Sequence, residues 1–260
     1  MGDGAVADVL RLDGVSKRFG GVVAVEGFSL TQGAEVITGI IGPNGAGKTT
    51  VFNLVTGVYP LDSGRILFGE RDITRLPSHR RTDLGIARTF QNIRLFRNLD
   101  VLDNLKVAHD MKVRYTLWEE MLRLPRVRRE ERTIHEQALH YLDYLQLSQY
   151  ARAKPANLPY GIQRRLELAR ALMTEPRLLL LDEPAAGLNP QEVRTLMDTI
   201  RKVREDHHLS VIVVEHHMEL IMNICSHIHV LDFGKKIAEG RPEEIKKNEA
   251  VLQAYLGDEG

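Results

Sequence analysis

Gly42-Pro43-Asn44-Gly45-Ala46-Gly47-Lys48-Thr49 decides the fold, because it matches the pattern G-x-x-x-x-G-K-[ST]. The apolar run 35–41 precedes it, and residues with helical periodicity follow from 47 to about 55. This order predicts a strand, a phosphate-binding loop and a helix. The glycines let backbone N–H groups turn toward phosphate oxygens, and the start of the helix adds positive charge there.

Two side chains of this stretch supply the chemistry of a nucleotide site. Lys48 brings a full positive charge to the β and γ phosphates, and the Thr49 hydroxyl is suited to Mg²⁺. The alternative, a chance glycine turn before a core helix, becomes untenable once the remaining motifs are counted. We expect the nucleotide to be held by the loop and the first helical turn, namely Asn44, Gly45, Ala46, Gly47, Lys48, Thr49 and Thr50.

A second apolar run, Leu178-Leu179-Leu180-Leu181, ends in two acids. A central parallel strand explains the leucines, and open α/β sheets place their ligands at the carboxyl ends of strands. We expect Asp182 to reach Mg²⁺ through its water shell and Glu183 to orient and deprotonate a water. A strand that simply ends in solvated acids is the alternative. His216 follows the predicted strand 210–215 and is a candidate sensor of the γ phosphate.

The composition limits the classes of partner. The chain has 260 residues, 43% hydrophobic and 27% charged, which suffices for a sizeable core. Its 35 basic and 35 acidic residues give a formal net charge of +0, so no global field favours nucleic acid. Since no window approaches the roughly 20 apolar residues of a spanning helix, a membrane role is expected to be peripheral.

The remaining pattern predicts an α/β fold, a P-loop NTPase core with a mostly parallel sheet. Short β-type runs at the start indicate an antiparallel flank, and leucines at helical spacing over 99–158 indicate an inserted helical subdomain. The core then comprises 1–98 and 159–260. A hairpin is expected over 227–238. The histidines show no metal spacing on one element, so no metal site is expected among them, namely His207, His208, His217, His227 and His229.

Further motifs follow in a familiar order, namely Gln91, Leu158-Pro159-Tyr160-Gly161-Ile162-Gln163, Ala186-Gly187-Leu188-Asn189-Pro190 and His216. Together with the phosphate loop and the apolar run that ends in Asp182 and Glu183, these motifs resemble the nucleotide-binding domain of ABC transporters over nearly the whole chain. The resemblance implies an ATPase whose catalytic residues are Glu183, His216, Lys48 and Gln91. It implies Mg²⁺ bound by Thr49, Gln91 and Asp182, and adenine stacked on Phe19. Pro159, Tyr160 and Gly161 take the place of the signature that grips the ATP of a second cassette.

The finer resemblance is to the ATP-binding subunits of branched-chain amino-acid importers. It rests on Arg88-Thr89-Phe90-Gln91, on the run 163–170 and on the ending Gln253-Ala254-Tyr255-Leu256-Gly257. It implies ATP and ADP as ligands, two transmembrane permease subunits, a second nucleotide-binding subunit and, indirectly, a solute-binding protein. The place implied is the cytoplasmic face of the inner membrane. A soluble ABC ATPase and a nucleotide-binding regulator are the alternatives, and the solute is not encoded.

Pro159 departs from the family pattern, which has serine at this position. Proline lacks the hydroxyl that would donate to the opposite γ phosphate, so we expect a weaker grip and a compensating, different partner cassette. The alternative is that the loss has little effect. The basic segment 112–132 is either a membrane-facing surface or a solvated helical face.

Overall fold

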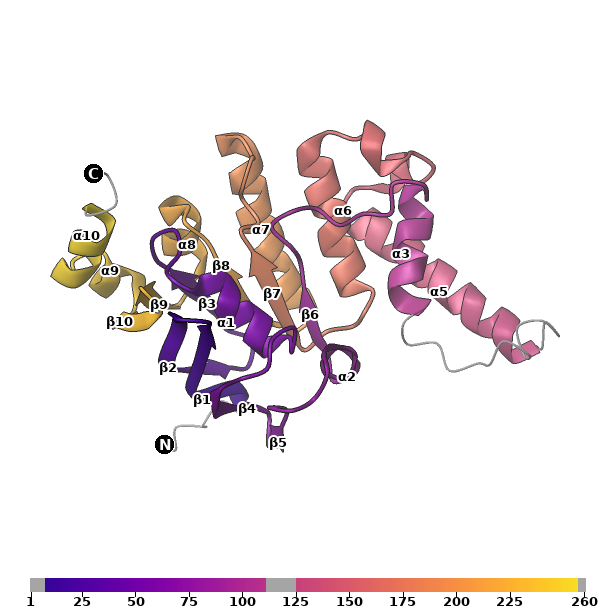
Figure 1. Ribbon diagram of the computed structural model, residues 1–260. Coiled ribbons are helices and arrows are strands. Elements are labelled where there is room, and N and C mark those ends of the chain that lie inside the picture. Colours follow the sequence, from indigo (N-terminus) through magenta and orange to yellow (C-terminus); the bar gives the residue numbers. More distant parts are fainter. Residues whose placement is uncertain (1–7, 111–124, 257–260) are drawn as a thin grey trace, which may run out of the picture. The chain divides into compact units, whose positions relative to one another are not determined.

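The computed structural model describes residues 8–110 and 125–256, and its contacts divide the chain into two units (Figure 1). Unit 1 comprises residues 1–91 and 177–260, and unit 2 comprises residues 92–176. The helical subdomain predicted over 99–158 falls inside unit 2. Unit 2 also includes the helix after residue 158, which the sequence prediction placed with the core.

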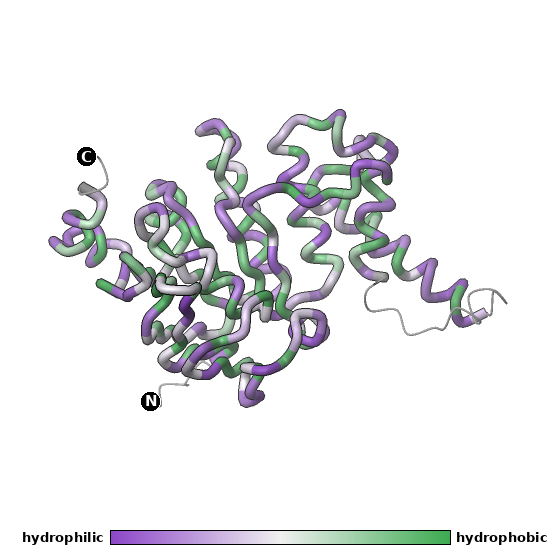
Figure 2. Tube along the Cα trace, in the orientation of Figure 1, coloured by the Kyte–Doolittle hydropathy of each residue, from purple (hydrophilic) through white to green (hydrophobic). Residues whose placement is uncertain are grey.

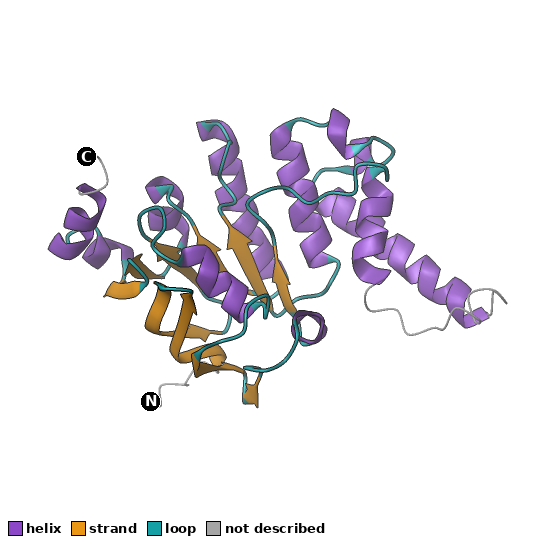
Figure 3. Cartoon of the chain, viewed as in Figure 1, coloured by secondary structure: helices purple, strands orange, loops and turns teal. Residues whose placement is uncertain are grey.

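Unit 1 contains a six-stranded sheet in the order β10-β9-β3-β8-β7-β6. Figure 3 draws the strands of the unit in orange and its helices in purple. Its pairings are parallel except for the edge pair of β10 and β9. Every residue of β3, β7 and β8 is buried, which explains their mostly apolar sequences; the polar exceptions are Thr38, Asp182 and Ser210. The strands are β3 (Ile37–Ile41), β6 (Ile86–Arg88), β7 (Leu178–Asp182), β8 (Ser210–Val214), β9 (His227–Asp232) and β10 (Lys235–Gly240).

A second, antiparallel sheet of unit 1 has the order β2-β1-β4-β5. Its strands are β1 (Asp8–Phe19), β2 (Val22–Gly33), β4 (Ser63–Phe68) and β5 (Arg71–Asp72). The first two are longer than the short runs predicted, because bulges carry each strand past its polar residues without ending the pairing. The mostly parallel sheet and the antiparallel flank thus confirm the predicted fold class.

Helix α1 (Lys48–Val55) follows the phosphate loop and packs in the core between the two sheets. Val51, Phe52 and Leu54 join one apolar cluster with residues of both sheets. Figure 2 shows the hydrophobic residues concentrated along the buried strands of this unit. The other helices of unit 1 are α2 (Ser78–Asp83), α7 (Pro190–Asp206), α8 (Met218–Ile224), α9 (Pro242–Ile245) and α10 (Glu249–Leu256).

Unit 2 is helical. Helix α3 packs against α5 and α6, and the fully buried Asn104 binds the preceding loop by accepting from Phe96 N and donating to Phe96 O. Of the basic segment 112–132, residues 112–124 lie outside the described part of the chain. No helix in the described ranges has the length and apolar composition needed to cross a membrane. The elements are α3 (Val101–Asp110), α5 (Pro125–Tyr144), the 3-10 turns Ser148–Tyr150 and Pro155–Asn157, and α6 (Tyr160–Leu172).

Candidate functional site

The strand register of unit 1 brings the predicted motifs to one edge of the parallel sheet. Ile40 of β3 pairs with Val214 of β8, and Val214 also pairs with Asp182 of β7. Leu180 of β7 pairs with Arg88 of β6. The phosphate loop and the loops after β6, β7 and β8 therefore begin at the same carboxyl edge, where open α/β sheets bind ligands.

Two glycines of the phosphate loop are required by space as well as by backbone angle. Gly42 has φ 151°, and a Cβ at this position would lie 2.0 Å from Leu231 O. Gly47 has φ 101°, and its Cβ would lie 2.3 Å from Ala24 O. Side chains larger than hydrogen therefore cannot occupy these positions without moving the backbone.

Lys48 is only 6% exposed and is oriented by the loop itself. Its Nζ donates to Gly42 O at 2.7 Å and to Pro43 O at 2.8 Å. A buried ammonium held by carbonyls beside a helix N-terminus is a ready partner for phosphate oxygens. The other predicted loop residues range from exposed to buried, with Asn44, Gly45 and Thr49 exposed, Thr50 half-buried and Ala46 buried.

The turn of the β9–β10 hairpin is hydrogen-bonded to the phosphate loop. Gly234 N donates to Ala46 O at 3.0 Å, and Glu26 N donates to Gly234 O at 2.8 Å. The loop is therefore held by strands of both sheets.

Two predicted catalytic side chains, Gln91 and His216, approach the carboxylate of a third, Glu183. Gln91 Nε2 donates to Glu183 Oε2 at 2.7 Å, and His216 Nδ1 lies 3.8 Å from the same oxygen. Glu183 itself has φ 45°, and its N–H donates to Val214 O at 2.8 Å. A non-glycine residue at positive φ is a strained conformation of the kind that clusters at functional sites.

Asp182 is held by a residue to which the sequence had given no role. Arg88 Nη2 contacts Asp182 Oδ2 at 2.7 Å, with the two side chains 7% and 3% exposed. Its Nη1 donates to Asn53 Oδ1 at 2.7 Å, and its guanidinium lies over Phe52 and Phe90. The second Asp182 oxygen, Oδ1, is buried without a hydrogen-bond partner among the described residues. An unsatisfied carboxylate oxygen fits a hydrated Mg²⁺.

Glu215 is a second residue that sequence reasoning missed. It is 0% exposed, and Oε1 accepts from Ala185 N at 2.7 Å. Oε2 accepts from His216 N at 2.9 Å and His217 N at 3.0 Å. One buried carboxylate thus fixes the loop after β7 and the turn that presents His216. Its only sequence signal is an acid at the end of an apolar strand.

Phe19, the predicted adenine platform, ends β1 and is 41% exposed. Tyr59 meets it edge to face with ring centroids 5.0 Å apart, and Lys17 Nζ lies 5.5 Å from its centroid. The partly exposed ring, fixed from one side, is suited to stacking on a base.

The predicted trans signature lies in unit 2 at the start of α6. Pro159 is the N-cap residue and provides no side-chain cap. Tyr160 is 41% exposed, and its hydroxyl accepts from Arg164 Nη2 at 2.8 Å. Gly161 lies in the first helical turn, where backbone N–H groups face outward from the helix end.

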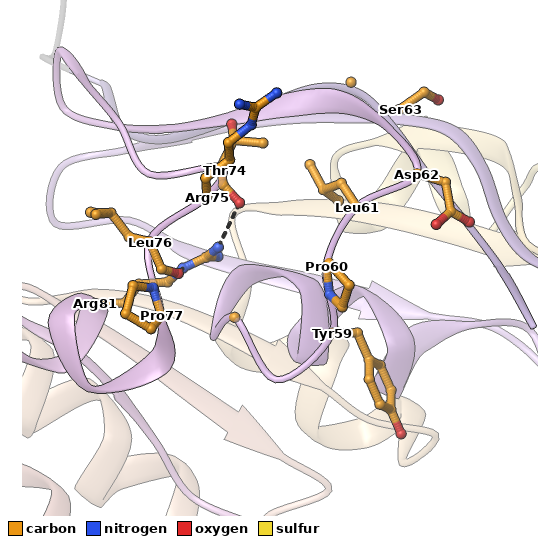
Figure 4. A pocket seen from close by; sticks show the side chains of 12 residues that line it. Tyr59, Pro60, Leu61, Asp62, Ser63, Thr74, Arg75, Leu76, Pro77 and Arg81 are labelled. Atoms are coloured by element: carbon orange, nitrogen blue, oxygen red, sulfur yellow. Dashed lines mark hydrogen bonds between the residues drawn. The ribbon is translucent and has the colours of Figure 1, made fainter.

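Figure 4 shows a pocket of about 470 Å³ between the end of α1 and the β4–β5 region. Its buried guanidinium, Arg81, donates to the last carbonyls of α1, Leu54 O at 2.6 Å and Val55 O at 2.8 Å. It also donates to Thr74 O and Leu76 O, and burial lowers its pKa to about 10. Arg81 therefore caps a helix, and the predicted site residues do not line this pocket.

Known proteins resemble this chain over nearly its whole length. The family model described as ABC transporter matches residues 25–186, and the model described as branched-chain amino acid ATP-binding cassette transporter matches residues 235–260. The high-affinity branched-chain amino acid transport ATP-binding protein BraF of Pseudomonas aeruginosa is 44% identical, covering 96% of this chain and 98% of BraF. LivG of Escherichia coli, which has the same description, is 41% identical over the same shares.

Solved structures show the same fold. An ATP-binding cassette of an ABC transporter in its ADP conformation superposes with a TM-score of 0.84 and 30% identity, covering 96% of this chain and 99% of that one. A nucleotide-free ATP-binding cassette from an ABC transporter superposes with a TM-score of 0.82 and 31% identity, covering 95% of this chain and 98% of that one. The chain therefore belongs to the ABC transporter family, in the group of its ATP-binding proteins that includes BraF and LivG.

Proposed function

We propose that this chain hydrolyses ATP to drive the import of branched-chain amino acids. Membership of the ABC family supports the ATPase activity, and the names of BraF and LivG support the solute class. The observation that carries the proposal is the convergence of Gln91 and His216 on Glu183, beside a glycine loop that holds Lys48. A module that only binds nucleotide has no need of such an oriented base, so this geometry disfavours the regulator.

The arrangement fits direct attack of water on the γ phosphorus. Glu183 accepts the water proton as the new P–O bond forms, and the bond to the bridging oxygen of ADP breaks with its electron pair. Gln91 holds the Glu183 carboxylate by a hydrogen bond, and His216 lies beside it, where its imidazole would help to orient the water and would be available to the γ phosphate. Lys48 stabilises the charge on the transferring group.

Mg²⁺ is proposed as the metal, because the donors are oxygens and Asp182 has an unsatisfied one. Thr49, Gln91 and Asp182 would hold it directly or through water. When bound, the ion neutralises charge on the β and γ phosphates.

The active unit is proposed to be a head-to-tail pair of cassettes, in which Pro159, Tyr160 and Gly161 of one meet the ATP of the other. Two permease subunits would receive the motion and a solute-binding protein would deliver the amino acid. The place of action would then be the cytoplasmic face of the inner membrane, without insertion. ATP binds the closed pair more tightly than the open one, so binding closes the pair and hydrolysis reopens it.

The test uses Glu183→Gln in the transporter assembled in proteoliposomes. Loss of the base should lower ATP turnover on the order of 10²-fold or more while ATP binding remains, and uptake of labelled leucine should fall equally. Glu219→Gln, the same change at an exposed acid of α8, is the matched control. Normal turnover in Glu183→Gln would refute the assigned base, and ATPase activity that no branched-chain amino acid stimulates would refute the solute class.

A further inference from the structure

The β9–β10 hairpin brings two histidines and a glutamate together. His227 and His229 are two residues apart on β9, so strand alternation places both on one face. Glu239 lies opposite His229 in the antiparallel pairing with β10. One possible ligand atom from each of the three residues lies within 4.8 Å of the other two. The rings of His227 and His229 meet edge to face, with centroids 5.0 Å apart.

His229 is the unusual member, because its ring is buried and its polar atoms are not satisfied. The residue is 3% exposed, and neither ring nitrogen has a hydrogen-bond partner in the described part of the chain. Nδ1 lies 3.2 Å from Glu239 Oε2, but this contact lacks the geometry of a hydrogen bond. Buried polar atoms in native structures are nearly always paired, so this ring requires an explanation.

The cluster is accessible from solvent on one side. The side chain of Glu239 is 49% exposed, whereas the ring of His229 is buried.

We propose that His227, His229 and Glu239 bind a divalent transition-metal ion of the zinc class. Two imidazoles and a carboxylate are a donor set that Zn²⁺ and Co²⁺ favour, and three protein ligands leave a position for water. The oxygen-preferring ions Mg²⁺ and Ca²⁺ do not match two nitrogen donors. The site is distinct from the proposed nucleotide site, since none of its residues belongs to the phosphate loop or to the carboxylates after β7.

Lys236 sharpens the proposal, because its ammonium contacts the same glutamate. Its Nζ pairs with Glu239 Oε2 and donates to Ser29 O at 3.1 Å. A metal ion bound by Glu239 must either displace the Lys236 ammonium or share the Glu239 carboxylate with it. Removing the charge in Lys236→Met should therefore raise metal affinity, whereas a purely structural histidine–glutamate pair would show no metal binding to raise.

A bound ion would join β9 to β10 across the hairpin whose turn supports the phosphate loop through Gly234 and Ala46. Because the ion binds the folded hairpin and not the unfolded chain, it should raise the melting temperature. This gives a readout that does not depend on ATP hydrolysis.

The experiment titrates the nucleotide-free full chain with Co²⁺ in excess Mg²⁺, following the visible ligand-field bands, and then displaces Co²⁺ with Zn²⁺. We expect one equivalent to bind. Glu239→Gln and His227→Ala should each weaken binding by at least roughly tenfold, since even residues that only support a ligand contribute that much. Both variants should retain wild-type circular dichroism, but Zn²⁺ should no longer raise their melting temperature.

Two controls separate this site from other sources of binding. Glu35→Gln breaks an exposed histidine–glutamate contact, in which His208 Nδ1 lies 3.2 Å from Glu35 Oε2, and should leave the affinity unchanged. Asp182→Asn should also leave it unchanged, because it alters only the proposed nucleotide site. The proposal is overturned if no stoichiometric Co²⁺ or Zn²⁺ binding occurs, if binding survives both Glu239→Gln and His227→Ala, or if Asp182→Asn abolishes it.

Discussion

Arg88→Met tests whether the buried pair with Asp182 holds the site together. The substitution keeps much of the stem between Phe52 and Phe90 but removes the ion pair with Asp182 and the hydrogen bond to Asn53. It leaves a carboxylate whose side chain is 3% exposed without its cation. Breaking a buried pair from one side costs about 3–5 kcal/mol. For a chain of this size that corresponds to a fall in melting temperature of about 6–20 °C.

The assay is a double-mutant cycle of Arg88→Met, Asp182→Asn and the two together, measured by urea unfolding. Each single variant leaves a buried group unpaired, whereas the double variant leaves neither charge. We therefore expect the double variant to be more stable than the sum of the single effects predicts, by about 2–3 kcal/mol.

Arg65→Met is the control, because it removes an exposed ion pair with Asp13 at 3.0 Å, with side chains 60% and 34% exposed. Its cost should stay below about 1 kcal/mol. If the Arg88 and Asp182 effects add within about 0.5 kcal/mol, the two groups are not coupled. The assignment of Arg88 as the residue that positions Asp182 would then be wrong.

Three further outcomes are expected. Lys48→Ala should weaken ATP binding by about 10- to 100-fold, since it removes a charge-assisted contact to phosphate worth about 1.5–3 kcal/mol, and equilibrium binding of a fluorescent ATP analogue measures this. Gly47→Ala should abolish ATP binding, because its Cβ would lie 2.3 Å from a carbonyl oxygen. Gly45→Ala should reduce ATP affinity less, because its Cβ would meet nothing within 4 Å. Equal affinities of the two variants would contradict the steric argument. Pro159→Ser supplies a hydroxyl at the N-cap and should raise ATPase activity of the assembled transporter. An unchanged rate would remove the hypothesis of a weakened trans grip.

The parts of the fold set by short-range patterns could be predicted from the sequence. The apolar runs that became β3, β7 and β8 are buried on both faces, so their composition alone marks them as central strands. The three-residue β6 (Ile86–Arg88) was not predicted, because it is too short for a period and takes its strand conformation from pairing with β7. Helix α2 was not predicted either, because its six residues are too few to show a helical period.

The site was predictable where a residue acts through its place in a motif, and not where it acts through a distant partner. Arg88 and Asp182 are 94 residues apart, and Glu215 reaches Ala185 across 30. Strand register brings such pairs together, and strands that are buried on both faces lack the alternation of apolar and polar residues from which a register could be inferred. The proximity of His227, His229 and Glu239 was not predicted either, because Glu239 comes from the neighbouring strand.

The strained backbone at Glu183 explains how two adjacent carboxylates take different roles. Alternation in a strand would send neighbouring side chains to opposite faces, and Asp182 follows this rule by pairing with Arg88 inside the unit. Positive φ at Glu183 ends the strand and turns its carboxylate to Gln91, which follows β6, and His216, which follows β8. One acid is thereby buried and fixed by a cation, while the other is presented between two flanking loops, where a water can be oriented. The backbone turn between them therefore separates the proposed magnesium ligand from the proposed general base.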